Sequence, residues 1–377
     1  MGASWVITAP RYREGAAGRA RVGRPLPIVF SGVRFSVIVP LYNRPEEIRE
    51  LLESLVEQTF QDFEVLVVED GSERDARAIV EGFSDRLDVR YFWKENTRQG
   101  FTRNYGFERA RGDWFVVFDS DCLIPKTYFE VVEAHLLAHP EVEVYGGPDA
   151  AHPSFTPLQK AISHAMTSPL TTGGIRGGAR NVGQYHPRSF NMGISRKAWE
   201  VSGGYRISVK GEDIEFSMRL IEHGLHSVLI PEAHVYHKRR TDFAQFRKQV
   251  RFFGTARVNI RKFCPGAIRP IHWMPSLFLL YLLAVVPLSL CLHFGMGWSV
   301  PASALPALPY ALWHLALVVS GWADTRSLRV AWLVPRAARI QLTSYGWGLL
   351  SEYIAVVLLR RRDPTIGKIR EVPACPR

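Results

Sequence analysis

Cysteine is scarce in this sequence, and no pair of cysteines has the spacing of a metal-binding or redox motif. The 377 residues include four cysteines, at positions 122, 264, 291 and 375, and no CxxC. This pattern excludes thiol-rich zinc modules and the disulfide frameworks of small secreted proteins. No secretory signal is recognisable in the first residues either. We therefore expect reduced thiols in a protein that faces the cytosol.

Charged residues are absent from one long stretch near the C-terminus. Between Arg269 and Asp324 there is no Asp, Glu, Lys or Arg. Residues 273–293 and 301–322 are each long and apolar enough to cross a bilayer core of about 30 Å as a helix. Trp322 ends the second stretch, where interfacial aromatic rings belong. Buried core helices are the alternative, but two such lengths in succession favour two membrane crossings.

A third apolar stretch, residues 340–359, fits a crossing less well. It contains Glu352, and arginines flank it on both sides, at positions 336 and 339 and at 360–362. Because positive residues mark the cytoplasmic side of a membrane, a single crossing would put one of these clusters on the wrong side. We expect an interfacial or re-entrant segment, within a membrane region that covers residues 269–377.

Acidic residues are outnumbered, with 36 Asp and Glu against 47 Lys and Arg, which gives a net charge of +11. This sign fits nucleic acid, an anionic membrane surface or a phosphate-bearing substrate as partner. Residues 1–34 carry six arginines and one acid, so we expect a flexible basic N-terminal arm.

Nine of the basic residues lie in residues 237–263, where apolar residues recur at roughly helical spacing. A basic amphipathic helix directly before a membrane span is typical of a segment that lies in an anionic membrane interface. We expect such a helix over residues 241–268, in contact with membrane lipids. No nucleic-acid-binding motif accompanies the basic residues, so we exclude nucleic acid as a partner.

Apolar strands alternate with helices from residue 35 onward. We expect strands at 35–39, 63–70, 87–93 and 114–118, with helices at 46–58, at 73–83 and around 101–110. This alternation predicts an α/β fold with a mostly parallel, doubly wound sheet. Ligands of such sheets bind beyond the carboxyl ends of the strands. Those ends carry four polar residues, Asn43, Asp70, Asp119 and Asp121.

The order of motifs resembles one enzyme family. FSVIVPLYNRPEEIRELLESLVEQTFQDFEVLVVEDGS (35–72), followed by FDSD (118–121) and GED (211–213), is similar to family 2 glycosyltransferases of the GT-A fold. The similarity implies a nucleotide-sugar-binding catalytic domain over residues 35–240. The most similar members are membrane-anchored bacterial enzymes of cell-surface or exopolysaccharide assembly.

Asp119 and Asp121 follow a buried strand, one residue apart. Transfer of a sugar from a nucleoside diphosphate builds negative charge on the departing diphosphate, and a divalent cation stabilises that charge. Mg²⁺ or Mn²⁺ suits carboxylate ligands, so we expect one of these metals at Asp119 and Asp121. A solvated turn or a helix cap is the alternative. The resemblance implies that His237, rather than His234, meets the metal or diphosphate, although an ordinary structural histidine remains an alternative.

The resemblance also implies the residues that bind the donor. Pro40, Tyr42 and Asn43 would line the nucleotide pocket with their backbone, and Asp70 would contact the base or ribose. Asn191, in FNMGISR (190–196), would lie near the hydroxyls of the sugar. An Asx turn without a ligand is the alternative for Asp70.

Two further donor-binding residues, Asn96 and Arg103, match the family's segment in ENTRQGFTRNYG (95–106). A guanidinium binds phosphate oxygens through two parallel hydrogen bonds, so Arg103 fits a contact to the diphosphate. A surface arginine at the start of a helix is an equal alternative.

Glu212 and Asp213 begin a predicted helix whose residues Ile214, Met218 and Ile221 share one face. A helix N-terminus keeps a carboxylate ionised, and an ionised carboxylate can take the proton of an attacking hydroxyl. In the resembled family the aspartate of this acid pair is the general base of a one-step inverting displacement. We expect Asp213 to be the base and Glu212 a supporting contact. A capping pair without a catalytic role is the alternative.

These expectations describe a metal-dependent inverting glycosyltransferase in the bacterial inner membrane, with its catalytic domain in the cytoplasm. It would move a single sugar from a nucleoside-diphosphate sugar, with a UDP-sugar as the expected donor, to a lipid-linked acceptor such as a polyisoprenyl (di)phosphate saccharide. Processive members of the family carry QxxRW after the base. The stretch that begins at Gln249 lacks its Arg and Trp, which favours a single transfer. Polyisoprenyl phosphate as direct acceptor, a nucleotidyltransferase and a non-catalytic membrane scaffold are the alternatives.

Overall fold

A computed structural model describes residues 32–172, 185–361 and 367–373 of the chain. Nearly all of the expected basic arm, residues 1–34, lies outside the described residues. The part of the chain from Gly32 onward forms one unit.

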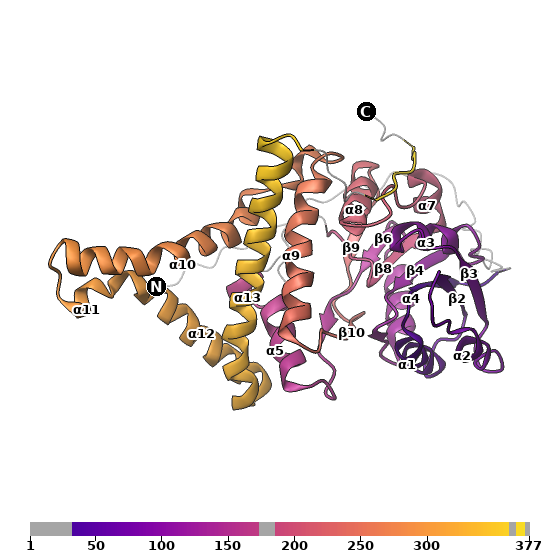
Figure 1. Ribbon diagram of the computed structural model, residues 1–377. Coiled ribbons are helices and arrows are strands. Elements are labelled where there is room, and N and C mark those ends of the chain that lie inside the picture. Colours follow the sequence, from indigo (N-terminus) through magenta and orange to yellow (C-terminus); the bar gives the residue numbers. More distant parts are fainter. Residues whose placement is uncertain (1–31, 173–184, 362–366, 374–377) are drawn as a thin grey trace, which may run out of the picture. The chain divides into compact units, whose positions relative to one another are not determined.

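A seven-stranded sheet lies at the centre of the N-terminal half, in the order β3-β2-β1-β4-β8-β6-β9 (Figure 1). Strands β3, β2, β1 and β4 run parallel, β8 is antiparallel to both β4 and β6, and β9 is parallel to β6. The predicted mostly parallel sheet is therefore confirmed. The strands are β1 (Phe35–Leu41), β2 (Phe63–Asp70), β3 (Val89–Lys94), β4 (Trp114–Phe118), β6 (Val144–Gly146), β8 (Asn191–Ser195) and β9 (Ser227–Leu229).

Helices cover both faces of this sheet, which explains why its central strands are continuous apolar runs. Helices α1 (Pro45–Val56), α2 (Arg77–Glu81) and α4 (Tyr128–Ala138) pack in one apolar core. Helices α3 (Gln99–Phe107), α7 (Arg196–Ser202) and α8 (Glu212–Glu222) pack in the other. A small second sheet joins β5 (Cys122–Leu123), β10 (Val235–His237) and β7 (Asp149–Ala150).

Several predicted boundaries differ from the structure by a few residues, and two of the differences have a clear physical reason. Strand β1 continues through Pro40 to Leu41. Strand β4 pairs with β1 only as far as Ile38, so Pro40 lies at a free edge, where its missing N–H breaks no ladder hydrogen bond. Helix α2 is shorter than the predicted 73–83. Side chains accept hydrogen bonds from the backbone N–H groups before α2. The Asn43 side-chain oxygen accepts from Glu73 and Arg74, and the Glu69 carboxylate accepts from Ala76. These bonds hold a loop in place of a first helical turn.

Three helices stand side by side next to the sheet domain: α5 (Pro157–Thr167), α9 (Phe243–Ile260) and α13 (Leu328–Tyr353) (Figure 1). A short helix, α6 (Pro169–Thr172), follows α5, and α13 continues as a π-helical turn, η5 (Ile354–Leu358). The third apolar stretch is thus the end of one continuous helix, and its expected interfacial or re-entrant position stays a prediction. Glu352, its unusual acid, lies 3.5 Å from the Lys210 ammonium.

Glycines allow α13 to approach its neighbours closely. A Cβ on Gly348 would lie 2.3 Å from the carbonyl oxygen of Arg251 in α9, and one on Gly346 would lie 2.3 Å from that of Pro275. A Cβ on Gly254 of α9 would lie 2.3 Å from the carbonyl oxygen of Tyr345. Backbone therefore packs on backbone where α13 crosses α9 and α10, and α13 is the helix to which the other elements attach.

A helical hairpin next to α13 contains the two expected membrane crossings. After η1 (Pro265–Ala267) and η2 (Pro270–Trp273) it consists of α10 (Met274–Leu290), η3 (Cys291–Gly295), α11 (Val300–Ser303), η4 (Leu305–Ala307) and α12 (Leu308–Thr325). Pro270–Gly295 and Val300–Thr325 are long and apolar enough to cross a membrane. In the most apolar part of the first span 0% of the residues are buried, and in the second 11%.

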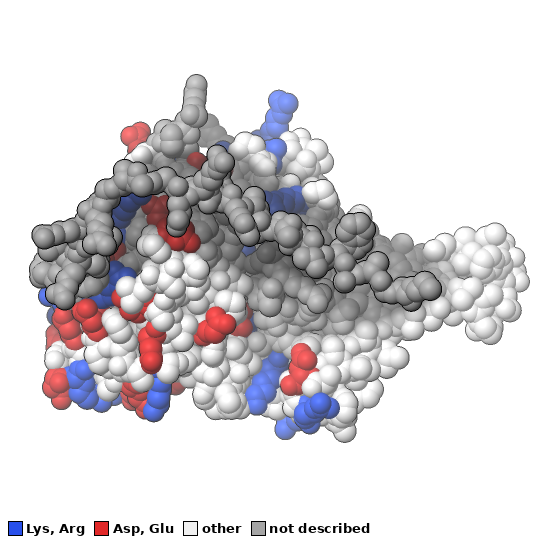
Figure 2. Space-filling model, turned by 180° about the vertical axis from the view of Figure 1, so that it is seen from behind, with Lys and Arg blue, Asp and Glu red and all other residues white. Residues whose placement is uncertain are grey.

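The core helix of a soluble protein would instead bury its apolar side chains. Figure 2 shows the end of the hairpin without charged side chains, whereas charges gather over the sheet domain. The end of α12 is fastened to α5 by His164, whose ring nitrogens lie 2.9 Å from an Asp324 oxygen and 3.0 Å from the Ser320 hydroxyl.

We predict that Gly348→Ala destabilises the protein. Helix propensity alone would favour alanine by about 1 kcal/mol, but the new Cβ meets the backbone oxygen of Arg251, which cannot move without separating α9 and α13. Overpacking costs about 1–3 kcal/mol, so the thermal unfolding midpoint of the detergent-solubilised chain should fall.

Gly266→Ala is the matched control, because no described atom lies within 4 Å of the added Cβ. A Gly348→Ala midpoint equal to that of the control would contradict the close helix contact.

Candidate active site

A cavity of about 1440 Å³ begins at the carboxyl ends of β1, β2 and β4 and extends to α10, α12 and α13. Most of the predicted site residues line it: Pro40, Tyr42, Asp70, Asn96, Arg103, Asp119, Asp121, Glu212, Asp213 and His237. The strand-end position agrees with the general rule for ligand sites in parallel sheets.

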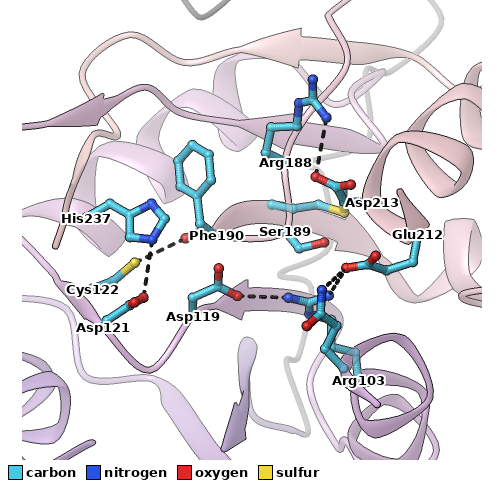
Figure 3. Close-up of polar contacts among 12 residues, drawn as sticks. Arg103, Asp119, Asp121, Cys122, Arg188, Ser189, Phe190, Glu212, Asp213 and His237 are labelled. Carbon is cyan, nitrogen blue, oxygen red and sulfur yellow. Dashed lines mark hydrogen bonds and ion pairs between the residues drawn. The ribbon is translucent and has the colours of Figure 1, made fainter. Parts of the chain in front are cut away.

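The two carboxylates of the DSD sequence point to different partners (Figure 3). Arg103 donates to Asp119 at 2.8 Å, and Asp121 pairs with Arg44 and lies 3.2 Å from the Nε2 of His237. Burial alone would raise the pKa of the Asp121 carboxyl, but the charges of His237 and Arg44 hold that pKa well below its usual value. Asp121 is therefore ionised.

The donor atoms around Asp121 suit a hard divalent cation. Ligand atoms of Asp121, Cys122 and His237 all lie within 4.8 Å of one another. Burial and the nearby carboxylates raise the pKa of the Cys122 thiol, so oxygen and nitrogen are the available donors. The Nδ1 of His237 is buried without a partner among the described residues. Together with the partly exposed Asp119, this set fits Mg²⁺ or Mn²⁺.

Arg103 is a buried residue and links two acids. Besides Asp119 it contacts Glu212 at 3.2 Å, and its guanidinium lies 5.4 Å from the centre of the Tyr205 ring. Burial would lower the pKa of Arg103, but Tyr205, Asp119 and Glu212 raise it. The alternative of a surface arginine is therefore wrong, while a contact from Arg103 to a diphosphate stays a prediction.

Glu212 and Asp213 are adjacent but differ in environment. Glu212 is buried, accepts hydrogen bonds from Gln99 and Arg103, and has its pKa raised by burial and by the neighbouring Asp213. The Asp213 side chain is 24% exposed, lies 3.4 Å from Arg188, and accepts a hydrogen bond from the N–H of Ile214. Asp213 is thus the acid that can reach a substrate. The predicted face of α8 is only half-buried, and Phe216 and Leu220 enter the core instead.

Asp70 and Asn96 organise the loop between β3 and α3. Asp70 accepts the N–H groups of Thr97 and Arg98 at 2.9 Å each and binds the Lys94 ammonium. The Asn96 side chain donates to the backbone oxygen of Asp70 at 2.9 Å. Asp70 is therefore not a simple Asx turn, and its predicted nucleotide contact would come from a carboxylate that already holds this loop.

The structure does not bring the side chains of Asn43 and Asn191 to the cavity. Asn43 caps the loop after β2 through its side-chain oxygen. Asn191 is fully buried between the hydroxyl of Tyr128 at 2.6 Å and the backbone oxygen of Ala233 at 2.8 Å. Other parts of the fold already use the amides of both side chains, while the predicted backbone contact of Asn43 and the predicted sugar contact of Asn191 stay predictions.

Three cationic or titratable residues near Asp213 were missed by sequence reasoning: Arg188, Arg257 and His186. Burial and the charges of Arg188, Arg269 and Arg257 lower the pKa of His186 to about 4, so its ring is neutral at physiological pH. Arg257 belonged to the predicted basic helix, but only the packing of α9 directs it to the cavity. No spacing in the sequence singles out Arg188.

Comparison with known proteins agrees with this geometry. Residues 36–201 match the family model for glycosyl transferase family 2, and this part of the chain belongs to that family. A mannosyltransferase from Pyrobaculum calidifontis, solved in complex with GDP-Man and Mn²⁺, is similar in structure with a TM-score of 0.50 and 19% identity. The likeness covers 85% of this chain and 86% of that chain. It shows the fold, which is of the GT-A type.

The sequence relatives match over about a quarter of the chain. A glycosyltransferase of Haemophilus influenzae is 39% identical over 102 residues, which is 26% of this chain and 33% of the relative. One of Rickettsia felis is 35% identical over 103 residues, 27% of this chain and 17% of the relative. The chain therefore spans a third or less of the length of these relatives.

We predict that Arg103→Met lowers the stability of the fold strongly. Removing one partner of a buried ion pair costs about 3–5 kcal/mol, because a charge is left uncompensated, and Arg103 serves two carboxylates. The free energy of unfolding, measured in urea, should fall by about 3–5 kcal/mol.

The matched control is Arg74→Met, since Arg74 and Glu46 form an ion pair whose side chains are both 67% exposed. Its unfolding midpoint should stay near that of the parent. Equal losses in the two variants would show that Arg103 is not the link between Asp119 and Glu212.

Proposed function

We propose that this chain is a metal-dependent inverting glycosyltransferase that moves a single sugar from a nucleoside-diphosphate sugar to a lipid-linked acceptor. Its catalytic domain, residues 35–240, would lie in the cytoplasm at the inner membrane of a bacterium. The observation that carries this proposal is the single cavity that joins Asp119, Asp121 and Asp213 to α10 and α12. These two helices are apolar and exposed enough to lie in a membrane.

The donor end of the cavity suits a nucleotide sugar. Asp119, Asp121 and His237 would hold Mg²⁺ or Mn²⁺, which when bound neutralises charge on the departing diphosphate. The mannosyltransferase of similar fold carries Mn²⁺ and a GDP-sugar, which fits this assignment. A UDP-sugar remains our expected donor.

In this proposal Asp213 acts as the base. The acceptor hydroxyl oxygen forms the new bond to the anomeric carbon while the bond from that carbon to the diphosphate breaks, and the hydroxyl proton passes to Asp213. Glu212 is less suited, because it is buried and its carboxylate is already occupied by Gln99 and Arg103. Glu212 instead orients Arg103, which also contacts Asp119.

The membrane end of the cavity suits a lipid. Phe278 and Tyr281 of α10 line it together with Tyr310 and Trp313 of α12. The two helices touch there, with the Phe278 and Trp313 rings 5.0 Å apart. They then reach α13 at different places, α10 at Gly346 and α12 near Val334. An acceptor chain held among α10, α12 and α13 can present its head group to Asp213 without leaving the membrane.

The cations near Asp213 favour an acceptor that carries phosphate. Arg188 and Arg257 line the cavity on the route from the membrane helices to Asp213. Burial lowers the pKa of Arg257, so an anion at this point would gain from a poorly solvated charge. A polyisoprenyl diphosphate saccharide and a polyisoprenyl phosphate both satisfy this chemistry.

The two acceptors differ in their need for a base. A saccharide hydroxyl must lose a proton, whereas a phosphate oxygen is already ionised. Direct transfer to polyisoprenyl phosphate would give a product with one phosphate and one sugar, and would depend little on Asp213. A nucleotidyltransferase would instead release pyrophosphate, and a non-catalytic scaffold would release nothing.

We predict that Asp213→Asn abolishes transfer but leaves donor binding nearly intact. Loss of a general base costs about 10²–10⁴-fold in rate. The purified chain would be incubated with Mn²⁺, a membrane lipid extract and labelled nucleotide sugars, and label in the organic phase would be counted. Asp85→Asn, an exposed acid far from the cavity, is the control. Equal loss of transfer and donor affinity in Asp213→Asn would remove it as the base.

We also predict that Asp119→Ala removes the metal dependence of nucleotide binding. Affinity for the nucleoside diphosphate would be measured by calorimetry with Mn²⁺ and with a chelator, and the two values should converge in the variant. A variant that keeps the full difference of the parent would contradict metal binding at Asp119.

A further inference from the structure

A second pocket, of about 440 Å³, lies on another side of α9 and contains four arginines. Arg247 and Arg251 come from successive turns of α9, and Arg336 and Arg339 come from successive turns of α13. The remaining lining residues are Leu279 of α10 and Ile340, Thr343, Ser344 and Trp347 of α13. Among the described residues, none lines both this pocket and the active-site cavity.

The four arginines lack acidic partners within the described part of the chain. Among residues 32–172, 185–361 and 367–373, no ion pair is formed by Arg247, Arg251, Arg336 or Arg339, although the Arg336 guanidinium lies 4.6 Å from the centre of the Phe243 ring. Like charges on neighbouring turns of a helix repel one another, and here two such pairs face each other across one helix contact. This arrangement becomes favourable when an anion binds between them.

The walls of the pocket are fixed in advance. Backbone packs on backbone at Gly348 and Arg251, and the Ser276 hydroxyl donates to the Gly346 oxygen at 3.0 Å. Helices α9, α13 and α10 therefore hold the arginines in place without the ligand. Preorganisation of this kind reduces the entropic cost of binding.

The position of the pocket points to the membrane surface. Leu279 belongs to the candidate span Pro270–Gly295, and Trp347, which is 50% exposed, lies beside it in the lining. Tryptophan is typical of the level at which lipid head groups meet the acyl chains. Arginines next to a membrane helix at this level are typical of a site for anionic head groups.

We propose that this pocket binds the phosphodiester head group of an anionic membrane lipid, separate from the acceptor. Guanidinium groups bind phosphate oxygens through paired hydrogen bonds, and Leu279 and Trp347 contact the glycerol and the first acyl carbons. The site rests on the membrane location of α10 and α12 given above, but not on the transfer chemistry. It fastens the α9–α13 contact, and with it the active site, to an anionic leaflet.

The test uses the full chain in an uncharged detergent, titrated with phosphatidylglycerol or with phosphatidylcholine. A ligand that binds the folded state raises the unfolding midpoint with its concentration. We expect a rise with phosphatidylglycerol and none with phosphatidylcholine. In R336Q/R339Q the concentration that gives half of the rise should increase about tenfold or more, since hydrogen bonds to charged groups are lost. R247Q/R251Q should behave in the same way.

R326Q/R329Q is the matched control, because it removes two exposed arginines at the junction of α12 and α13, outside the pocket lining. It should respond to phosphatidylglycerol as the parent does. Equal weakening of all three double variants would mean diffuse charge attraction and would overturn the site. The proposal also fails if both lipids act alike, or if soluble glycerol phosphate gives the same rise.

Folding and catalysis are checked separately. Each variant should keep the parent's midpoint without lipid and its metal-dependent nucleotide binding. Loss of the lipid response with intact nucleotide binding supports the pocket, whatever the result of the transfer assay.

Discussion

The backbone contact between α9 and α13 determines where the active site lies relative to the apolar hairpin. Gly254 and Gly348 let the two helices touch, and Gly346 brings α10 against the same helix. Because α9 lines the cavity with one side and packs on α13 with another, the distance from Asp213 to the apolar hairpin is set by rigid helix packing rather than by a linker. The contact of Lys210 with Glu352 adds a second link, directly before the acid pair.

Charge in the site is arranged around buried cations rather than around free acids. Arg103 connects Asp119 to Glu212, and Arg44 and His237 hold Asp121. Despite burial, His237 and Arg44 hold the pKa of Asp121 below its usual value, and Arg103 orients the carboxylates of Asp119 and Glu212. Asp213 is the exception, with a partly exposed carboxylate and a long contact to Arg188. Asp213 is therefore free to accept a proton in the proposed reaction, whereas Asp119, Asp121 and Glu212 are held by ion pairs with neighbouring side chains.

The sequence pattern predicted the elements that depend on neighbouring residues, but it did not predict contacts between residues that lie far apart in the chain. Strands β2 and β4 have the predicted bounds, since VLVV (65–68) and WFVVF (114–118) are continuous apolar runs. Residues at strand ends were also predicted to gather, because parallel strands share one edge. The partners of Asn191 and Arg103 were not predictable, because Tyr128 and Glu212 lie on other elements far along the chain. Similarly, Arg336 and Arg339 flank an apolar stretch in the sequence, whereas the packing of α13 on α9 makes them half of the lining of a pocket.

The C-terminal tail constrains the number of membrane crossings. Ile369 pairs with Ile207, and the N–H of Arg370 donates to the oxygen of Arg206 at 2.8 Å. Residues 367–373 therefore lie against the loop that leads to Glu212, beside the sheet domain. An odd number of crossings after α9 would leave the tail on the opposite side, out of reach of that loop. If α10 and α12 cross the membrane as proposed, these two crossings return the chain to the side of the sheet domain, and α13, with Glu352 and its arginines, runs beside α9 without crossing.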